Sequence, residues 1–152
     1  MGLKETISSD LQKAMKAGDK TRLETLRTVR AALLEKEIEK RGSASPVTPE
    51  DELGVLTGAA KKRRESIEMF EKGGRMDLVE QETKELAIIQ EYLPKQLSAV
   101  EIEEIIRNIM GEVGASSPAD FGKVMPAVMK QLKGKADGRL VQELVRKALS
   151  PA

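Results

Sequence analysis

The sequence of 152 residues contains no cysteine, no histidine and no tryptophan. Without cysteine there is no disulfide framework, thiolate nucleophile, iron–sulfur cluster or zinc knuckle. Without histidine there is no imidazole general base, no Ser-His-Asp triad and no usual zinc site. The three aromatic residues, Phe70, Tyr92 and Phe121, are too scattered for the stacking platform of a single-strand-binding protein. Carboxylate or lysine chemistry, Mg²⁺ held by carboxylates and a binding role remain.

The charges of the chain nearly cancel, since 26 lysines and arginines accompany 25 acidic residues. This balance argues against indiscriminate nucleic-acid binding by the whole chain. No apolar run approaches the roughly 18 residues of a membrane span. The first ten residues contain no apolar signal core. We therefore expect a cytoplasmic protein with no membrane partner.

Apolar residues recur with helical spacing along nearly the whole chain, and no segment alternates with the period of a strand. The spacing predicts a first helix that ends at Gly18. A second helix starts near Asp19 and ends at Gly42. The stretch from Gly42 to Pro49 is rich in Gly, Ser and Pro and is typical of a loop.

Two further helices are predicted before the middle of the chain. Thr48 has the character of an N-cap, with Pro49 at the first helical position and acidic residues in the first turn. The helix that begins there is expected to stop at Gly73-Gly74. Asp77 and Glu80 have a spacing similar to that of a capping box, which predicts a fourth helix.

Leu93-Pro94 is the clearest boundary in the sequence, because a residue before proline is pushed out of the helical region. Ser98 and Glu101 then form a capping box for the next helix. Three short helices with one-sided apolar stripes follow. Pro126 lies inside the second of them, so that helix either begins near the proline or kinks there. The other end signals are Gly114, Ser117-Pro118 with Asp120, and the turn from Gly134 to Gly138.

These patterns predict an all-α protein of two domains. Residues 1–94 are expected to form an N-terminal bundle of three to four longer helices that pack side by side. Residues 95–152 are expected to form a compact domain of three short helices. Methionines at positions 110, 125 and 129 fall on the apolar stripes of the second domain, which favours core packing over a promiscuous groove.

The charged motifs of the helices favour ordinary solvated surfaces. Pairs of glutamates share helix faces, namely Glu35 with Glu39, Glu82 with Glu85, and Glu101 with Glu104. Lysines and arginines surround them, so we assign no catalytic or metal-binding role and expect no cofactor. The basic run from Lys61 to Arg64 points around the whole helix, and glutamates four residues after Lys61 and Arg64 supply partners.

The C-terminal segment carries an excess of positive charge. From Ser117 onward the sequence contains seven basic residues and only three acidic ones, Asp120, Asp137 and Glu143, which gives this segment a net charge of +4. They are Lys123, Lys130, Lys133, Lys135, Arg139, Arg146 and Lys147. The glycine turn opens the last helix, where free N–H groups attract anions, although Asp137 can cap those groups itself. A phosphate-contacting patch and a plain glycine turn with solvated lysines both remain open.

Four motifs resemble the YqeY family. They are A-M-K-A-G-D-K from Ala14, S-I-E-M-F-E-K-G-G-R-M-D-L-V from Ser66, E-x-x-E-L-A-I-I-Q-E-Y-L-P-K-Q-L-S from Glu82, and G-K-V-M-P-A-V-M-K-Q-L-K-G-K-A-D-G-R-L-V from Gly122. The likeness covers essentially the full length, and the Y-L-P-x-Q-L-S boundary is its most specific piece.

The resemblance implies a two-domain helical fold whose C-terminal part is similar to the tail domain of GatB. GatB is a subunit of the tRNA-dependent amidotransferase, which uses glutamine as amide donor, and its tail helps to hold the tRNA. The G-K-A-D-G turn and Arg139 belong to the shared segment, so the resemblance favours phosphate contacts there. The chain lacks the catalytic body of GatB and the amidase subunit. Carbon–nitrogen ligase activity is therefore attached by family association only.

Two functions of different class follow. The first is a tRNA-associated binding module or accessory factor of the amidotransferase system, with tRNA and amidotransferase or other protein subunits as expected partners. The second is a protein–protein adaptor that docks through its N-terminal helices and has no RNA role. A stand-alone enzyme ranks third, because the sequence offers no residue set for amide transfer. The sequence leaves the oligomeric state open.

Overall fold

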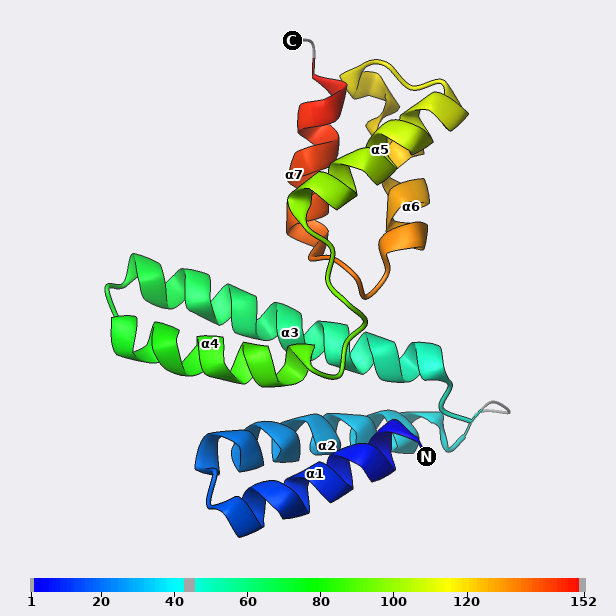
Figure 1. Ribbon diagram of the computed structural model, residues 1–152. Coiled ribbons are helices and arrows are strands. Elements are labelled where there is room, and N and C mark those ends of the chain that lie inside the picture. Colours follow the sequence, from blue (N-terminus) through cyan, green and yellow to red (C-terminus); the bar gives the residue numbers. More distant parts are fainter. Residues whose placement is uncertain (1, 43–45, 151–152) are drawn as a thin grey trace. The chain divides into compact units, whose positions relative to one another are not determined.

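The computed structural model in Figure 1 describes residues 2–42 and 46–150. These residues form helices and connecting turns without a strand, which confirms the all-α prediction. None of the helices within these ranges is long and apolar enough to cross a bilayer. The elements are α1 (Leu3–Ala17), α2 (Lys20–Lys40), α3 (Pro49–Lys72), α4 (Met76–Gln90), α5 (Ala99–Val113), the 3₁₀ helix η1 (Pro118–Asp120), α6 (Phe121–Leu132) and α7 (Gly138–Leu149).

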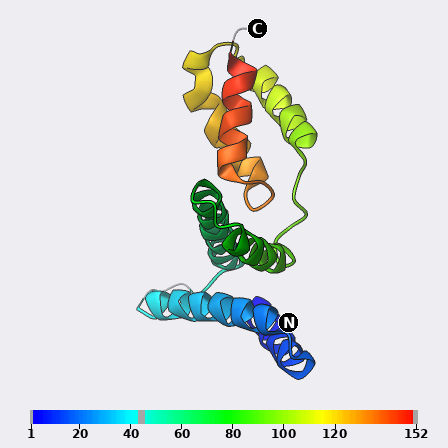
Figure 2. The same ribbon diagram turned by 90° about the vertical axis from the view of Figure 1, so that its left-hand side faces the viewer.

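The chain divides into two compact units, Met1–Leu93 and Pro94–Ala152. In the first unit α1 and α2 form one helical hairpin and α3 and α4 form another, and α2 packs against both helices of the second hairpin (Figures 1 and 2). Apolar side chains from all four helices meet between the hairpins. The buried members of this core are Ile7, Leu11, Leu26, Val29, Leu33, Leu56, Ala60 and Ile89.

The helix ends of the first unit follow local chemistry. Gly18 has a φ of 70°, which a residue without a side chain adopts most easily, and its N–H caps the last carbonyls of α1. The carboxylate of Asp19 accepts a hydrogen bond from the backbone N–H of Arg22, as an N-cap does. Thr48 and Asp51 form a reciprocal capping box at the start of α3. These three ends are where the sequence predicts them.

Two predicted helix ends need correction. The fourth helix starts one residue before Asp77, with Arg75 at the N-cap position and no side-chain cap. The carboxylate of Asp77 instead accepts hydrogen bonds of 3.2 and 3.1 Å from the guanidinium of Arg75. The second helix ends at Lys40 rather than at Gly42. Residues 43–45 of the predicted loop lie outside the described residues.

The second unit is a set of three helices, α5, α6 and α7, around its own core (Figure 1). Ser98 and Glu101 form the predicted capping box, and Gly114 ends α5 with a φ of 68°. The three expected methionines pack against the core from its edge. The buried residues are Ile102, Ile106, Ile109, Ala115, Val124, Val128, Leu132, Val141, Val145 and Leu149.

Pro126 lies in the interior of α6, which runs from Phe121 to Leu132. Of the two predicted alternatives, a helix that begins near the proline is therefore wrong, and the proline lies inside the helix as the other alternative requires. Proline removes one N–H donor and presses against the carbonyl four residues earlier. Here that residue is Gly122, and both Gly122 and Pro126 are exposed, so water can reach the freed carbonyl. The buried stripe of α6 continues past the proline undisturbed.

Candidate nucleic-acid interface

The turn between α6 and α7, residues 133–138, is called the basic turn below. It contains Lys133, Lys135 and two glycines, and Arg139 follows it directly. Gly134 has a φ of 78°, and the N–H of Lys135 donates a 2.8 Å hydrogen bond to the carbonyl of Leu132. The side chain of Asp137 caps α7, as the sequence suggests, by accepting from the N–H of Arg139. This cap occupies part of the positive end of α7.

Gln96 and Leu97, which precede α5 and are called the strap, hydrogen-bond to the backbone of the basic turn. The N–H of Leu97 donates a 2.9 Å hydrogen bond to the carbonyl of Lys135. The amide of Gln96 donates 2.8 Å hydrogen bonds to the carbonyls of Gly134 and Pro94. The Y-L-P-K-Q-L-S and G-K-A-D-G motifs are thus in direct contact, which sequence reasoning did not foresee. The turn carries its lysines on a backbone that is already fixed.

The seven basic candidates are all exposed, but they fall into two groups. Helices α6 and α7 are joined by a short turn and pack against each other, so the end of one lies beside the start of the other (Figure 1). The first group lies at the end with the basic turn and consists of Lys130, Lys133, Lys135 and Arg139. The second group lies at the opposite end and consists of Lys123, Arg146 and Lys147.

The two groups differ in the contacts that their charged side chains make within the second unit. In the described part of the chain, Lys130, Lys133 and Lys135 have no ion-pair or hydrogen-bond partner for their ammonium groups. Arg146 and Lys147 lie in the last turn of α7, where a cation offsets the negative helix end. Arg146 also covers the ring of Phe121, 5.3 Å from its centroid. Lys130 also lies in such a last turn, that of α6, so Lys133 and Lys135 between the two helices are the better candidates for an external anion.

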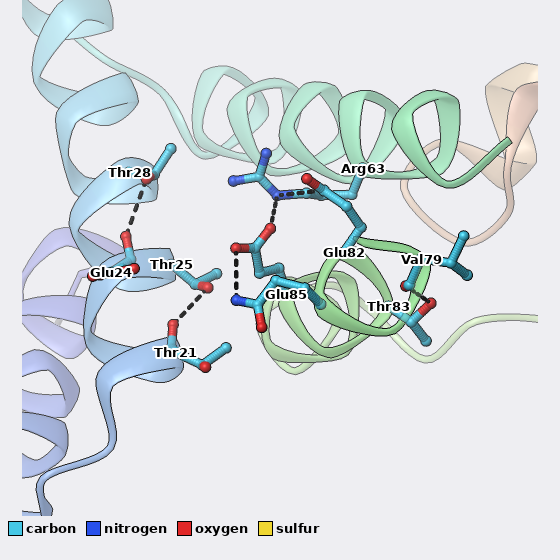
Figure 3. Close-up of polar contacts among 10 residues, drawn as sticks. Thr21, Glu24, Thr25, Thr28, Arg63, Val79, Glu82, Thr83 and Glu85 are labelled. Atoms are coloured by element: carbon cyan, nitrogen blue, oxygen red, sulfur yellow. Dashed lines mark hydrogen bonds and ion pairs between the residues drawn. The ribbon is translucent and has the colours of Figure 1, made fainter. Parts of the chain in front are cut away.

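The basic run on α3 behaves differently from its sequence interpretation. Lys61 and Lys62 are exposed, and within the described ranges no ion pair joins Lys61 to Glu65. The ion pair predicted between Lys61 and Glu65 is therefore not formed. Arg63 turns inward and contacts α4 instead (Figure 3). The run does not form one patch, as its helical spacing indicates.

The prediction that Glu82 and Glu85 are ordinary solvated residues is wrong. Their side chains are only 19% and 17% exposed, and the Nε atom of Arg63 lies 3.6 and 3.1 Å from them, respectively. Figure 3 shows this ion cluster between α3 and α4. A signal was available, because Glu82 falls three residues after Val79 and four before Leu86 and so lies on the apolar stripe.

In the ion cluster, the single positive charge of Arg63 does not fully compensate the two partly buried carboxylates. Burial raises the pKa of Glu82, the charge of Glu85 raises it further, and Arg63 only partly offsets both effects. Arg63 Nε and Glu82 Oε2 are buried without a hydrogen-bond partner in the described part of the chain. No group of three or more acidic side chains that could hold a metal occurs among the described residues. The cluster ties α3 to α4.

The family model for YqeY, described as Yqey-like protein, matches residues 4–149. The chain belongs to the YqeY family. The match spans both compact units, including the strap and the basic turn.

Relatives of this YqeY chain are found in fungi. It is 30% identical over 147 residues to "Altered inheritance of mitochondria protein 41, mitochondrial" of Pyrenophora tritici-repentis, which covers 94% of the chain and 78% of the relative. It is 35% identical over 118 residues to the protein of the same name in Lachancea thermotolerans, covering 74% of the chain and 60% of the relative. An uncharacterized protein of Schizosaccharomyces pombe is 32% identical over 98 residues, covering 64% of the chain and 77% of the relative.

These names contradict the expected cytoplasmic location. The Pyrenophora and Lachancea relatives of the YqeY chain are both named as mitochondrial proteins. The expectation rested on the missing apolar signal core, which bears on secretion alone. Mitochondrial targeting uses amphipathic, Arg-rich segments, so an apolar core is not its mark.

Proposed function

We propose that this YqeY chain is a tRNA-associated binding module or accessory factor of the glutamine-dependent tRNA amidotransferase system. The observation that carries the proposal is the basic turn, which presents unpaired lysines on a backbone fixed by Gln96 and Leu97. Exposed lysines without partners can bind the phosphates of a nucleic-acid backbone. Because the backbone of the turn is already fixed, little of its conformational entropy is lost on binding. The family resemblance to the GatB tail supplies the choice of tRNA.

The side chains, rather than the start of α7, do the binding in this proposal. Asp137 caps that helix end, so its carboxylate competes with an incoming phosphate for the N–H groups. Gly138 is exposed and has no side chain to hold the phosphate backbone away. The four basic residues of the first group then contact phosphates as separate charges. Four such contacts predict a log–log salt slope of roughly 3 to 4.

The chain contributes no catalytic groups in this proposal. The partly buried carboxylates of Glu82 and Glu85 are tied to Arg63 at the contact between α3 and α4, and that of Asp51 caps α3 and pairs with Lys40. Transfer of an amide nitrogen from glutamine requires a site that releases ammonia and one that activates the acceptor. Any carbon–nitrogen ligase activity of the system therefore belongs to a partner, such as an amidotransferase subunit, which this chain assists by holding the tRNA.

The test compares two double variants that remove the same charge. Lys133→Ala with Lys135→Ala removes two cations from the basic turn, and Lys61→Ala with Lys62→Ala removes two exposed cations from α3. At low salt the first variant should bind tRNA roughly 10-fold more weakly than the parent, while the second stays within twofold. Equal losses in both variants, or no tRNA binding by the parent, would overturn the proposal.

A protein–protein adaptor is the second candidate, and one observation favours it. Met69 and Met76 flank the tip of the α3–α4 hairpin and are 72% and 61% exposed. Flexible, exposed thioether side chains suit a partner surface. Replacing both with serine should abolish recovery of a protein partner with the tagged chain while tRNA binding is retained. Loss of the tRNA instead would contradict the adaptor function.

A further inference from the structure

A half-open pocket of about 330 Å³ lies at the end of the second unit opposite the basic turn. It is formed where α6 starts and α7 ends, and Phe121 and Leu149 are the terminal residues of those helices. The lining is mostly apolar, with one guanidinium and one hydroxyl. Its residues are Pro118, Phe121, Arg146, Leu149 and Ser150.

Arg146 and Phe121 form a cation–π pair at this pocket. The guanidinium carbon of Arg146 lies 5.3 Å from the centroid of the Phe121 ring, within the range of a cation–π contact. Arg146 nevertheless remains exposed and lines the pocket. A guanidinium is planar and stacks on flat partners, which an ammonium cannot do. The pair therefore places a planar cation next to an aromatic ring at this pocket.

Ser150 adds a polar edge to the same pocket. Its hydroxyl donates a 2.8 Å hydrogen bond to the carbonyl of Arg146, and the hydroxyl oxygen remains able to accept. The carboxylate of Asp120, from the adjoining η1, accepts from the N–H groups of Ser116 and Ser117. These hydrogen bonds lower the pKa of Asp120 and anchor its charge in the turn. Lys123 and Lys147 supply further positive charge at this end.

We propose that this pocket holds one unpaired base of the RNA, stacked on the guanidinium of Arg146 and the ring of Phe121. The inference rests on the proposed function and adds the part of the RNA that is recognised. An unstacked base is flat and apolar on its faces and carries hydrogen-bond donors and acceptors at its edge, which suits a lining of apolar side chains with one guanidinium donor and one hydroxyl. An acidic peptide would use the guanidinium but would leave the apolar residues without a partner.

One aromatic ring suffices for a single base, although it cannot serve successive bases along a strand. The pocket and the basic turn lie at opposite ends of α7, a helix of 12 residues. Such a helix is about 18 Å long. A folded RNA can contact both ends at once, with phosphates at the turn and an extruded loop base in the pocket.

The test uses the absence of tryptophan from the chain. Phe121→Trp places a single fluorophore in the pocket and keeps a ring beneath Arg146. Adenosine monophosphate should quench this fluorescence, whereas ribose 5-phosphate, which has the phosphate without the base, should not. Met69→Trp is the matched control, since it places the fluorophore on an exposed tip of the first unit. It should respond to neither compound.

A second pair of variants separates stacking from charge in the Phe121→Trp background. Arg146→Lys keeps the positive charge but removes the planar guanidinium on which a base can stack. The concentration of adenosine monophosphate that gives half-maximal quenching should therefore rise roughly 10-fold. Lys62→Ala removes an exposed charge from α3 of the first unit and should leave the quenching unchanged. Equal quenching by both compounds, or an Arg146→Lys variant that matches its parent, would overturn the inference.

The failure of this inference is distinguishable from failure of the proposed function. If tRNA binding depends on Lys133 and Lys135 but no base quenches the fluorophore, the pocket proposal is wrong and the tRNA proposal stands. Quenching by adenosine monophosphate without tRNA binding would indicate a free-nucleotide site. That result would contradict the pocket as a site for an RNA base.

Discussion

The phenol of Tyr92 donates a 2.5 Å hydrogen bond to the carboxylate of Asp10, which ties the turn after α4 to α1 across 82 positions of sequence. The guanidinium of Arg22 lies 2.6 Å from the carboxylate of the neighbouring Glu91. Together these contacts fix the last residues before Leu93-Pro94 onto the first hairpin. The end of the first unit is therefore anchored by polar contacts as well as by its apolar core.

Titration of Tyr92 tests this anchor directly, because Tyr92 is the only tyrosine. Burial, together with the hydrogen bond to Asp10, raises the pKa of Tyr92 to about 12. Ultraviolet titration of the phenolate should therefore show a midpoint near pH 12. The stabilisation is present below the ordinary tyrosine pKa of about 10 and is lost as pH rises from there to about 12. A midpoint near pH 10 in the folded protein would contradict the contact.

Replacing Tyr92 with Phe measures what the anchor contributes to stability. The substitution keeps the ring and removes the hydroxyl, which leaves the carboxylate of Asp10 without this donor. We expect a loss of about 1 kcal/mol in the free energy of unfolding, measured by denaturant titration at neutral pH. Thr28→Ala is a suitable control, since it removes an exposed hydroxyl that bonds only within its own helix. It should change stability by less than about 0.5 kcal/mol.

Glu82→Gln should stabilise the protein at neutral pH. The pKa of Glu82 is raised on folding, so its ionised form costs stability above that pKa, and this cost disappears as pH falls through it. The neutral amide keeps the shape and can donate to Glu85. We expect a gain of up to about 1 kcal/mol at neutral pH that shrinks toward zero in acid. Glu80→Gln, on the exposed face of α4, should give no comparable gain, and a loss at Glu82 would show that Arg63 dominates.

Gly54 and Gly58 lie one turn apart in the interior of α3, where glycine is unfavourable. Both are exposed, and no heavy atom lies within 4 Å of a Cβ built on either. Alanine at each position should therefore stabilise the protein by about 1 kcal/mol, measured by thermal or denaturant unfolding. Gly114→Ala is the contrasting variant and should destabilise, because Gly114 has a φ of 68°. Loss of stability at Gly54 or Gly58 would contradict the open surroundings.

Local signals in the sequence predicted much of the fold. Helix ends at Gly18, Thr48 and Ser98 are correct because a cap depends on residues within one turn. The capping box predicted at Asp77 is not formed, because the guanidinium of Arg75, two residues earlier, hydrogen-bonds to the Asp77 carboxylate. The spacing of Asp77 and Glu80 alone could not reveal that hydrogen bond.

The candidate site was harder to predict, because its parts are distant in sequence. The basic residues near Lys133 and Lys135 were identified from composition, but their division between two ends follows from how α6 packs on α7. The bond from Gln96 to Gly134 spans 38 positions, and nothing local to either residue indicates it. The contact of Arg63 with Glu82 and Glu85 likewise depends on the pairing of α3 with α4.

The salt dependence of tRNA binding tests the central claim most directly. Four phosphate contacts by the basic residues of the first group predict that log Kd rises with log salt with a slope of roughly 3 to 4. Replacing Lys133 and Lys135 with Ala should lower that slope by roughly 1.4 to 1.8, since each neutralised contact removes about 0.7 to 0.9. The Lys61 and Lys62 double variant should keep the parent slope. A parent protein that binds no tRNA at low salt, or a slope unchanged by loss of both turn lysines, would contradict the account.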